Sequence, residues 1–251
     1  MIHSVILMGQ SNMSGRGNFG EVEPIFDERI QVLRCGKWRT MRGPVNPEDH
    51  KCEVSLAESF AASYAADHPE DMVGLVPCSF CGSSLDQWAP GELLYDHAVA
   101  MTKLAQRTST VVAILWHQGE CDCLENLHGT YETRFLTMIN QFRKDTGLED
   151  VPVVMGELGP DLLKKTGTKR DYTLSLDINR QIRKLAQEQD FIGYVPSEGL
   201  TNYPNNVHFD SVSLRRFGLR YYAEFQKLEK TDRVFVQKED PNKNRSGMEN
   251  I

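Results

Sequence analysis

The chain has 251 residues, of which 40% are hydrophobic and 25% are charged, and its formal net charge at pH 7 is −7. This length supports a sizeable core without metal or disulfide crosslinks, and the composition excludes a disordered chain and a collagen-like repeat. The acidic excess argues against nucleic acid or an anionic membrane as a partner, because phosphate binding requires clustered Lys and Arg. We read no membrane span, which needs ~20 apolar residues, and no signal peptide. We therefore expect a cytoplasmic protein with reduced cysteines.

Short apolar runs, rich in Val and Ile and bounded by turn residues, recur along the chain. They do not alternate with polar residues, which is typical of strands buried on both faces of a sheet. The predicted strands are 2–8, 30–34, 72–77, 110–116, 151–156 and 191–195. Helices are predicted from Ser55, over 91–107 and 129–145, around Ile178–Leu185, and from Ser211 to Leu228. Strands that alternate with helices predict a parallel sheet covered on both faces.

Two stretches differ from this alternation. Apart from the strand at 30–34, residues 16–50 are rich in Gly, Pro and charge, and we expect an irregular excursion there. Beyond residue 236 the chain has little to bury. We therefore predict a single domain over 1–236 and a flexible tail over 237–251.

Polar segments follow two of the predicted strands and a third precedes the last predicted helix; functional groups gather at strand ends in open α/β sheets. Ser11 lies in a turn flanked by glycines after the first strand, Glu120 follows the fourth strand, and His208 precedes the last helix. Each also has an ordinary structural interpretation: a capping serine, a solvated carboxylate, and a histidine beside a helix start. Together they supply the nucleophile, acid and base that acyl transfer requires.

These segments resemble the sialate O-acetylesterase and family 6 carbohydrate esterase group of the SGNH hydrolase superfamily. The similar blocks, in the expected order, are Gly9–Met13, Leu75–Cys78 with Gly82–Ser84 and Trp88, Trp116–Glu120, and Val207–Phe209 followed by Leu214 and Gly218–Tyr221. The resemblance covers about residues 2–228. It implies a flavodoxin-like three-layer α/β/α sandwich and an esterase that removes acetyl groups from sugar hydroxyls.

The resemblance also implies roles for individual residues. Ser11 is the expected nucleophile and His208 its base. The backbone N–H groups of Ser11 and Gly82 and the side chain of Gln118 are the expected oxyanion hole, with Gln10 beside them. Neither a cofactor nor a metal is expected, and the partner is a small acetylated carbohydrate.

One position departs from the superfamily pattern, which has aspartate three residues before the catalytic histidine. Here that residue is Asn205, and an amide favours the wrong histidine tautomer; the same change in a serine protease costs about 10⁴ in turnover. The glutamate of the His-Gln-Gly-Glu signature has been assigned as the acid within the group, so we expect Glu120 to fill that role. Asp210 is the second candidate, and capping of the last helix is its alternative role.

Four cysteines follow the third and fourth strands, at Cys78, Cys81, Cys121 and Cys123. They raise the alternative of a zinc site, but one C-x-x-C and one C-x-C do not form the repeated pair typical of zinc ligands. Burial as small apolar side chains is their ordinary use. We therefore predict no metal.

The expected substrate is an acetylated xylo-oligosaccharide or a similar sugar, with Trp38 or Trp88 as a stacking surface and core packing as the alternative for Trp88. A sialate O-acetylesterase, another small-acyl esterase, and a weakly catalytic carbohydrate-binding protein are the other hypotheses. An anionic sugar would require arginines in the pocket, for which Arg16, Arg39 and Arg42 are candidates. Residues 16–50 and 157–175 are the expected specificity loops.

Overall fold

The structure is a computed structural model that describes residues 1–47 and 51–230. The predicted tail at 237–251 and the predicted domain end at residue 236 lie outside these residues. Of the helices described, none combines the length and apolar character needed to cross a membrane.

A mostly parallel sheet of seven strands forms the centre of the described structure. Its order is β3-β2-β4-β1-β5-β6-β7. The strands are β1 (Ile2–Gly9), β2 (Ile30–Arg34), β3 (Lys37–Thr40), β4 (Met72–Pro77), β5 (Thr110–His117), β6 (Val153–Gly156) and β7 (Ile192–Val195). Neighbours pair in parallel except β2 and β3, which are antiparallel. The predicted parallel α/β sheet is confirmed.

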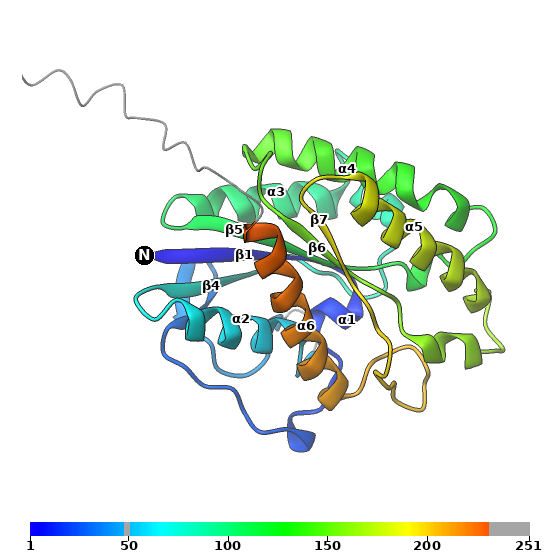
Figure 1. Ribbon diagram of the computed structural model, residues 1–251, viewed down its shortest axis with the longest axis horizontal. Helices are drawn as coiled ribbons and strands as arrows, with labels where there is room; N and C mark the ends of the chain where they lie inside the picture. Colours follow the sequence, from blue (N-terminus) through cyan, green and yellow to red (C-terminus); the bar gives the residue numbers. More distant parts are fainter. Residues whose placement is uncertain (48–50, 231–251) are drawn as a thin grey trace, which may run out of the picture.

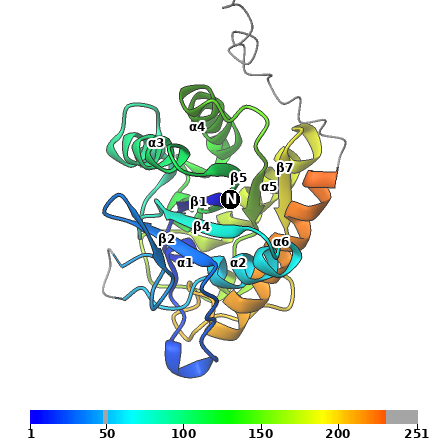
Figure 2. The same cartoon turned by 90° about the vertical axis from the view of Figure 1, so that its left-hand side faces the viewer.

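Helices cover both faces of this sheet and give a three-layer sandwich (Figure 1). They are α1 (Ser11–Ser14), α2 (Leu56–Asp67), α3 (Leu93–Gln106), α4 (Tyr131–Thr146), α5 (Ser175–Glu188) and α6 (Ser211–Lys230). Helices α3, α4 and α5 lie on one face, and α2 and α6 lie on the other, as Figure 2 shows from the side of the N-terminus. The predicted α/β/α layering is therefore confirmed.

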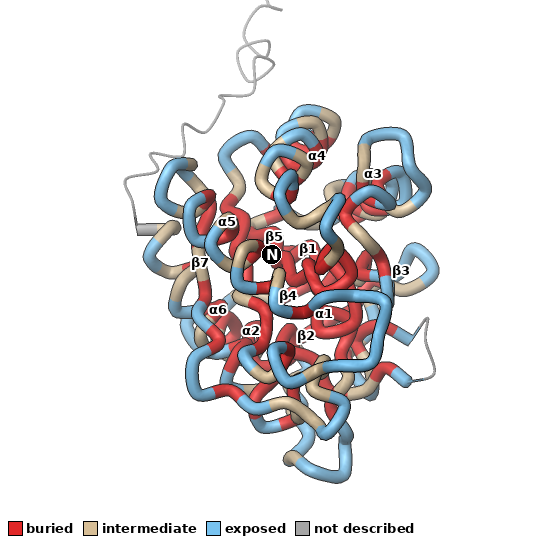
Figure 3. Tube along the Cα trace, turned by 90° about the vertical axis from the view of Figure 1, so that its right-hand side faces the viewer, coloured by how far each residue is buried: buried red, intermediate tan, exposed pale blue. Residues whose placement is uncertain are grey.

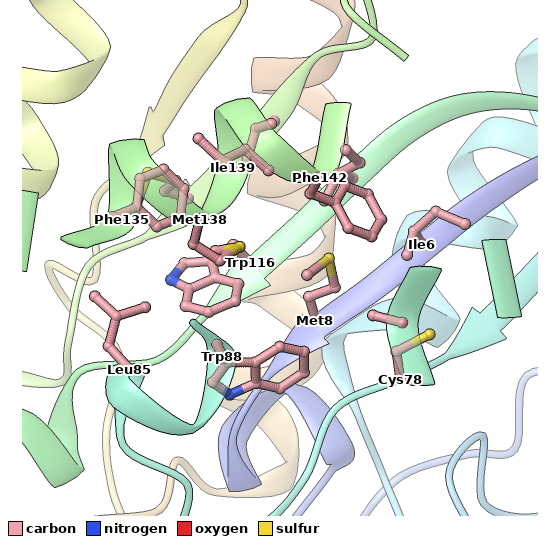
Figure 4. Packing of buried hydrophobic residues seen from close by; sticks show 14 of the residues in the cluster. Ile6, Met8, Cys78, Leu85, Trp88, Trp116, Phe135, Met138, Ile139 and Phe142 are labelled. Carbon is pink, nitrogen blue, oxygen red and sulfur yellow. The ribbon is translucent and has the colours of Figure 1, made fainter. Parts of the chain in front are cut away.

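The central strand explains why the sequence pattern is a continuous apolar run. Val5 and Leu7 of β1 pack into the core beneath α2 and α6, whereas Ile6 and Met8 pack into the core beneath α3, α4 and α5. Alternate side chains of a strand point to opposite faces, so both sets must be apolar when both faces are covered. Figure 4 shows Ile6 and Met8 in the core beneath α3, α4 and α5, and Figure 3 shows β1 buried among its neighbours.

The stretch expected to be irregular contains a hairpin. Strand β3 pairs with β2 through a turn at Cys35 and Gly36, whose φ angles are 48° and 74°. The pattern missed β3 because it is an edge strand whose residues alternate between exposed and half-buried positions. Such a strand has no apolar run for a sequence pattern to detect.

Two predicted helix starts are confirmed, and both helices belong to one layer. Ser55 caps α2 by accepting the N–H of Ala57 at 3.2 Å, and α6 begins at Ser211. The two helices approach closely at Gly218, where an added Cβ would lie 2.0 Å from the carbonyl oxygen of Leu56. Glycine therefore allows the helices to pack backbone against backbone.

Candidate active site

The sharp turn at the carboxyl end of β1 positions Ser11. Gly9 ends the strand with a φ of +126°, and a Cβ there would lie 2.2 Å from the carbonyl oxygen of His117. Only glycine tolerates this backbone and this approach to β5. Ser11 follows at the first position of α1 and is buried.

The loop before α6 brings His208 to this serine. His208 Nε2 lies 3.0 Å from Ser11 Oγ, although 197 residues separate the two in sequence. The carbonyl group of His208 accepts the N–H of Tyr203 at 2.8 Å, and Asn202 forms a β-bridge with Phe209. The loop is thus a small hairpin that holds the histidine backbone in place.

The imidazole of His208 is an accessible proton acceptor near neutral pH. Burial, and to a smaller extent the positive charge of Arg16, lower its pKa to about 4. The ring is therefore uncharged at neutral pH, as a general base must be.

Asn205 occupies the other side of the His208 ring, with its Nδ2 3.0 Å from Nδ1. The Oδ1 atom of Asn205 accepts the backbone N–H groups of Val207 at 2.9 Å and His208 at 3.0 Å. These two donors fix the amide orientation, so the NH₂ group faces Nδ1. Since Nδ1 then accepts a hydrogen bond, the resting tautomer carries its proton on Nε2.

The structure does not show the expected contact between Glu120 and His208, which corrects the sequence prediction. Within residues 1–47 and 51–230, no hydrogen bond or ion pair joins these two side chains. Glu120 Oε1 accepts from Asn12 Nδ2 at 2.6 Å and lies 3.8 Å from His117 Nδ1. The carboxylate is buried behind the serine turn, because it follows a tight turn at Gly119.

The second acid candidate, Asp210, is a helix cap. Its Oδ1 accepts the N–H of Ser213 at 2.8 Å, and its Oδ2 accepts from the hydroxyl of Thr201. Oδ1 therefore caps α6, while Oδ2 binds the preceding loop, and the alternative role predicted for this residue is the one observed.

A cavity of about 390 Å³ opens beside Ser11 and His208. The groups that line it come from several loops at the carboxyl ends of the strands. They are Gln10, Ser11, Arg16, Cys81, Gly82, Glu120, Cys121, Arg170, Tyr172, Val207 and His208. The volume is in the range of small-molecule sites.

Of the residues predicted to form the oxyanion hole, Ser11 and Gly82 line the cavity and Gln118 does not. Gly82 lines the cavity with a φ of +75°. Neither its N–H nor that of Ser11 donates a hydrogen bond to another of the described residues. Gln118, by contrast, is fully buried and donates to Ser83 O at 3.1 Å and to the carboxylate of Asp122. Its side chain is therefore part of the framework and does not line the cavity, which corrects the prediction.

Gln10 lines the cavity in an orientation set by the backbone. Its Oε1 accepts the N–H groups of Gly119 at 3.4 Å and Cys121 at 3.3 Å. An oxygen held by two donors directs the NH₂ group away from them. Gln10 and Cys121 both lie on the cavity wall.

The tryptophans expected to stack on a sugar lie elsewhere. Trp88 is fully buried and packs edge-on against Trp116, with ring centroids 5.4 Å apart (Figure 4). Trp38 lies on the edge strand β3 and donates to Thr108 Oγ1 at 2.9 Å. Tyr172 is the aromatic residue on the cavity wall.

Two arginines line the cavity, of which the sequence indicated one. Arg16 lies there as expected, whereas Arg42 stacks on the ring of Phe26 and Arg39 belongs to β3. Arg170 was not singled out by the sequence, although the loop 157–175 was. Its guanidinium contacts the carbonyl oxygen and the thiol of Cys121, each at 3.5 Å.

The four cysteines near the site do not share a centre. Cys78 and Cys123 are buried in the core, where burial raises the pKa of each thiol, in Cys78 to about 12. Cys121 contacts Arg170, and Cys81 lies 3.9 Å from Cys52, sulfur to sulfur. No group of three or more metal-ligating side chains assembles within the described part of the chain.

Comparisons with known proteins show the family to which this chain belongs. Residues 2–227 match the family described as carbohydrate esterase, sialic acid-specific acetylesterase. This chain belongs to that family. A relative described as a probable carbohydrate esterase of Arabidopsis thaliana is 27% identical to this chain over 239 residues. The match covers 85% of this chain and 86% of the relative.

The acetylesterase-family fold is also seen in solved structures. An Arabidopsis thaliana protein superposes with a TM-score of 0.78 at 22% identity, over 90% of this chain and 98% of its own. NanS gives 0.74 at 16% identity, over 92% and 98%. A carbohydrate acetylesterase from Xanthomonas citri gives 0.67 at 16% identity, over 90% of this chain and 56% of its own. At these identities the likeness concerns the fold.

Proposed function

We propose that this chain is a carbohydrate O-acetylesterase in which Ser11 is the nucleophile and His208 the general base. The observation that carries the proposal is the 3.0 Å distance from Ser11 Oγ to His208 Nε2 at the wall of a cavity. Membership of a carbohydrate esterase family supports the reaction class.

The proposed reaction follows from this pair. The imidazole of His208 first moves its proton from Nε2 to Nδ1. Ser11 Oγ then bonds to the acetyl carbon while its proton passes to Nε2, and the carbonyl oxygen becomes an oxyanion. Collapse breaks the bond to the sugar oxygen, which takes the proton from Nε2. A water molecule then repeats the cycle on the acetyl-enzyme and releases acetate.

The oxyanion would be bound by groups that the fold directs at the cavity. The N–H groups of Ser11 and Gly82 are two candidates, and the NH₂ group of Gln10 is a third. Removal of one such donor typically lowers turnover by about 10²- to 10³-fold. Gln10→Ala, which keeps both backbone donors, tests the side-chain contribution.

The experiment for the reaction is acetate release from p-nitrophenyl acetate, acetylated xylo-oligosaccharide and an O-acetylated sialic acid. Ser11→Ala and His208→Ala should abolish release, while His97→Ala, a control on the exposed face of α3, should retain it. Turnover that persists in Ser11→Ala would contradict the proposed mechanism. Sugar binding without Ser11-dependent turnover would favour the carbohydrate-binding hypothesis.

The cavity favours an acetylated sugar that carries a negative charge over a neutral xylo-oligosaccharide. Arg16 and Arg170 both line it, and among the described residues no carboxylate pairs with Arg170. A guanidinium binds a carboxylate strongly through paired N–H groups. Arg170→Gln should raise KM for the O-acetylated sialic acid at least tenfold and leave KM for p-nitrophenyl acetate unchanged. Equal effects on both substrates would argue against the anionic sugar.

A further inference from the structure

Asn12 joins the serine turn to the histidine loop through its side-chain amide. Its Nδ2 donates to the carbonyl oxygen of Val207 at 3.1 Å, and its Oδ1 accepts the N–H of Phe209 at 3.1 Å. These two peptide groups flank His208 in the sequence. One amide therefore holds the backbone on both sides of the histidine, and Asn12 is itself the residue after Ser11.

The second N–H of the Asn12 amide is held by Glu120, whose Oε1 accepts it at 2.6 Å. Both residues are at most 1% exposed, so neither side chain can exchange this bond for one with bulk water. The same Oε1 lies 3.8 Å from Nδ1 of His117, a fully buried imidazole beneath the site. A buried donor that loses its acceptor is strongly destabilised, which makes the Glu120 contact decisive for the orientation of Asn12.

The orientation of the amide follows from these three partners together. Glu120 Oε1 and Val207 O are acceptors, and the N–H of Phe209 is a donor. Reversal of the amide would place its oxygen against two acceptors and its NH₂ group against a donor. Asn12 thus has one allowed orientation, and in that orientation it positions the histidine loop.

We propose that Asn12 is a positioning residue for the Ser11–His208 pair, and that Glu120 acts on catalysis by fixing Asn12. This inference rests on the proposed function. It gives the buried glutamate of the Trp-His-Gln-Gly-Glu segment a role without contact to the catalytic imidazole. Glu120 orients the amide, the amide holds the peptide groups on either side of His208, and Nε2 stays within hydrogen-bond distance of Ser11 Oγ.

The test compares Glu120→Gln with Glu120→Ala, using p-nitrophenyl acetate. The glutamine side chain keeps an Oε1 that accepts from Asn12, so Glu120→Gln should retain kcat within about threefold. Alanine removes the acceptor, and Glu120→Ala should lower kcat by roughly 10- to 100-fold with KM little changed. A loss of about 10⁴ in Glu120→Gln would overturn the proposal, because only a direct acid role requires the charge.

Variants of Asn12 supply the second arm. Asn12→Ala should lower kcat by roughly 10- to 100-fold, and Asn12→Asp, which sets a carboxylate against Glu120 and Val207 O, should be at least as poor. The double variant Asn12→Ala/Glu120→Ala should be no worse than the poorer single variant, because both act through one contact. Additive losses, or wild-type kcat in Asn12→Ala, would overturn the proposal.

Two further measurements separate this inference from the proposed function and from a loss of folding. Labelling of Ser11 by a fluorophosphonate should slow in parallel with kcat in each alanine variant, while the melting temperature reports folding. If Ser11→Ala retains full activity, the proposed function fails. If Ser11→Ala is inactive and the Asn12 variants are as fast as wild type, only the positioning role fails. Should an alanine variant not fold, Glu120→Gln and Asn12→Asp decide the outcome.

Discussion

Replacement of Asn205 by Asp is expected to accelerate the enzyme, because the amide holds the base in its unproductive tautomer. Two backbone N–H groups, at 2.9 and 3.0 Å, occupy Asn205 Oδ1 and direct its NH₂ group to His208 Nδ1. To accept the proton of Ser11, the ring must move its own proton from Nε2 to Nδ1. Two donors then face each other across 3.0 Å.

The magnitude follows from what this rearrangement loses. The hydrogen bond from Asn205 to His208 is broken, and since Asn205 is exposed its NH₂ group can turn to water. The cost is then the net value of one hydrogen bond, about 0.5–1.5 kcal/mol. In Asn205→Asp, one carboxylate oxygen would keep the two backbone N–H groups and the other would accept from Nδ1. We therefore expect kcat/KM to rise by about 2- to 10-fold, less than the factor of about 10⁴ known for the corresponding change in a serine protease, where the acid is buried.

The assay is hydrolysis of p-nitrophenyl acetate across pH, with Asn206→Asp as control. Asn206 is the next residue and tolerates aspartate at its φ of 59°, so the control adds the same charge without the contact to His208. A carboxylate beside the ring also favours the imidazolium, so the acid limb of Asn205→Asp should move to higher pH. An unchanged or lower kcat/KM in folded Asn205→Asp would refute the tautomer argument.

Two other predictions concern charge and packing. Because burial lowers the pKa of His208 to about 4, kcat/KM should lose its base only as pH falls toward about 4, and Arg16→Gln should shift this limb to higher pH; a shift to lower pH would contradict the sign. Gly218→Ala should destabilise the fold by about 1–3 kcal/mol despite the better helix propensity of alanine, since its Cβ would meet the Leu56 carbonyl oxygen at 2.0 Å. Thermal unfolding should show a melting temperature lower by several degrees, while Gly129→Ala, which meets no atom within 4 Å, should leave it unchanged; equal melting temperatures would mean that α2 and α6 pack less closely than described.

The sequence alone was enough to predict six of the seven strands of the sheet, most helix starts and the turn that carries Ser11. These features depend on local patterns: apolar runs for strands buried on both faces, a capping serine at α2, and polar residues at strand ends. The edge strand β3 escaped because its burial is partial, and its pairing with β2 depends on a hairpin turn.

Only the tertiary structure decided which side chains meet at the site. Glu120 and Asn12 are 108 residues apart, and the choice of Asn12 over His208 as its partner depends on how two loops pack. Likewise, Gln118 turns into the core, and Arg170 reaches the cavity from a loop without a regular pattern. The local apolar pattern predicts which residues of each helix or strand are buried. Contacts between loops depend instead on side-chain orientation and distance, which are fixed only when the layers pack.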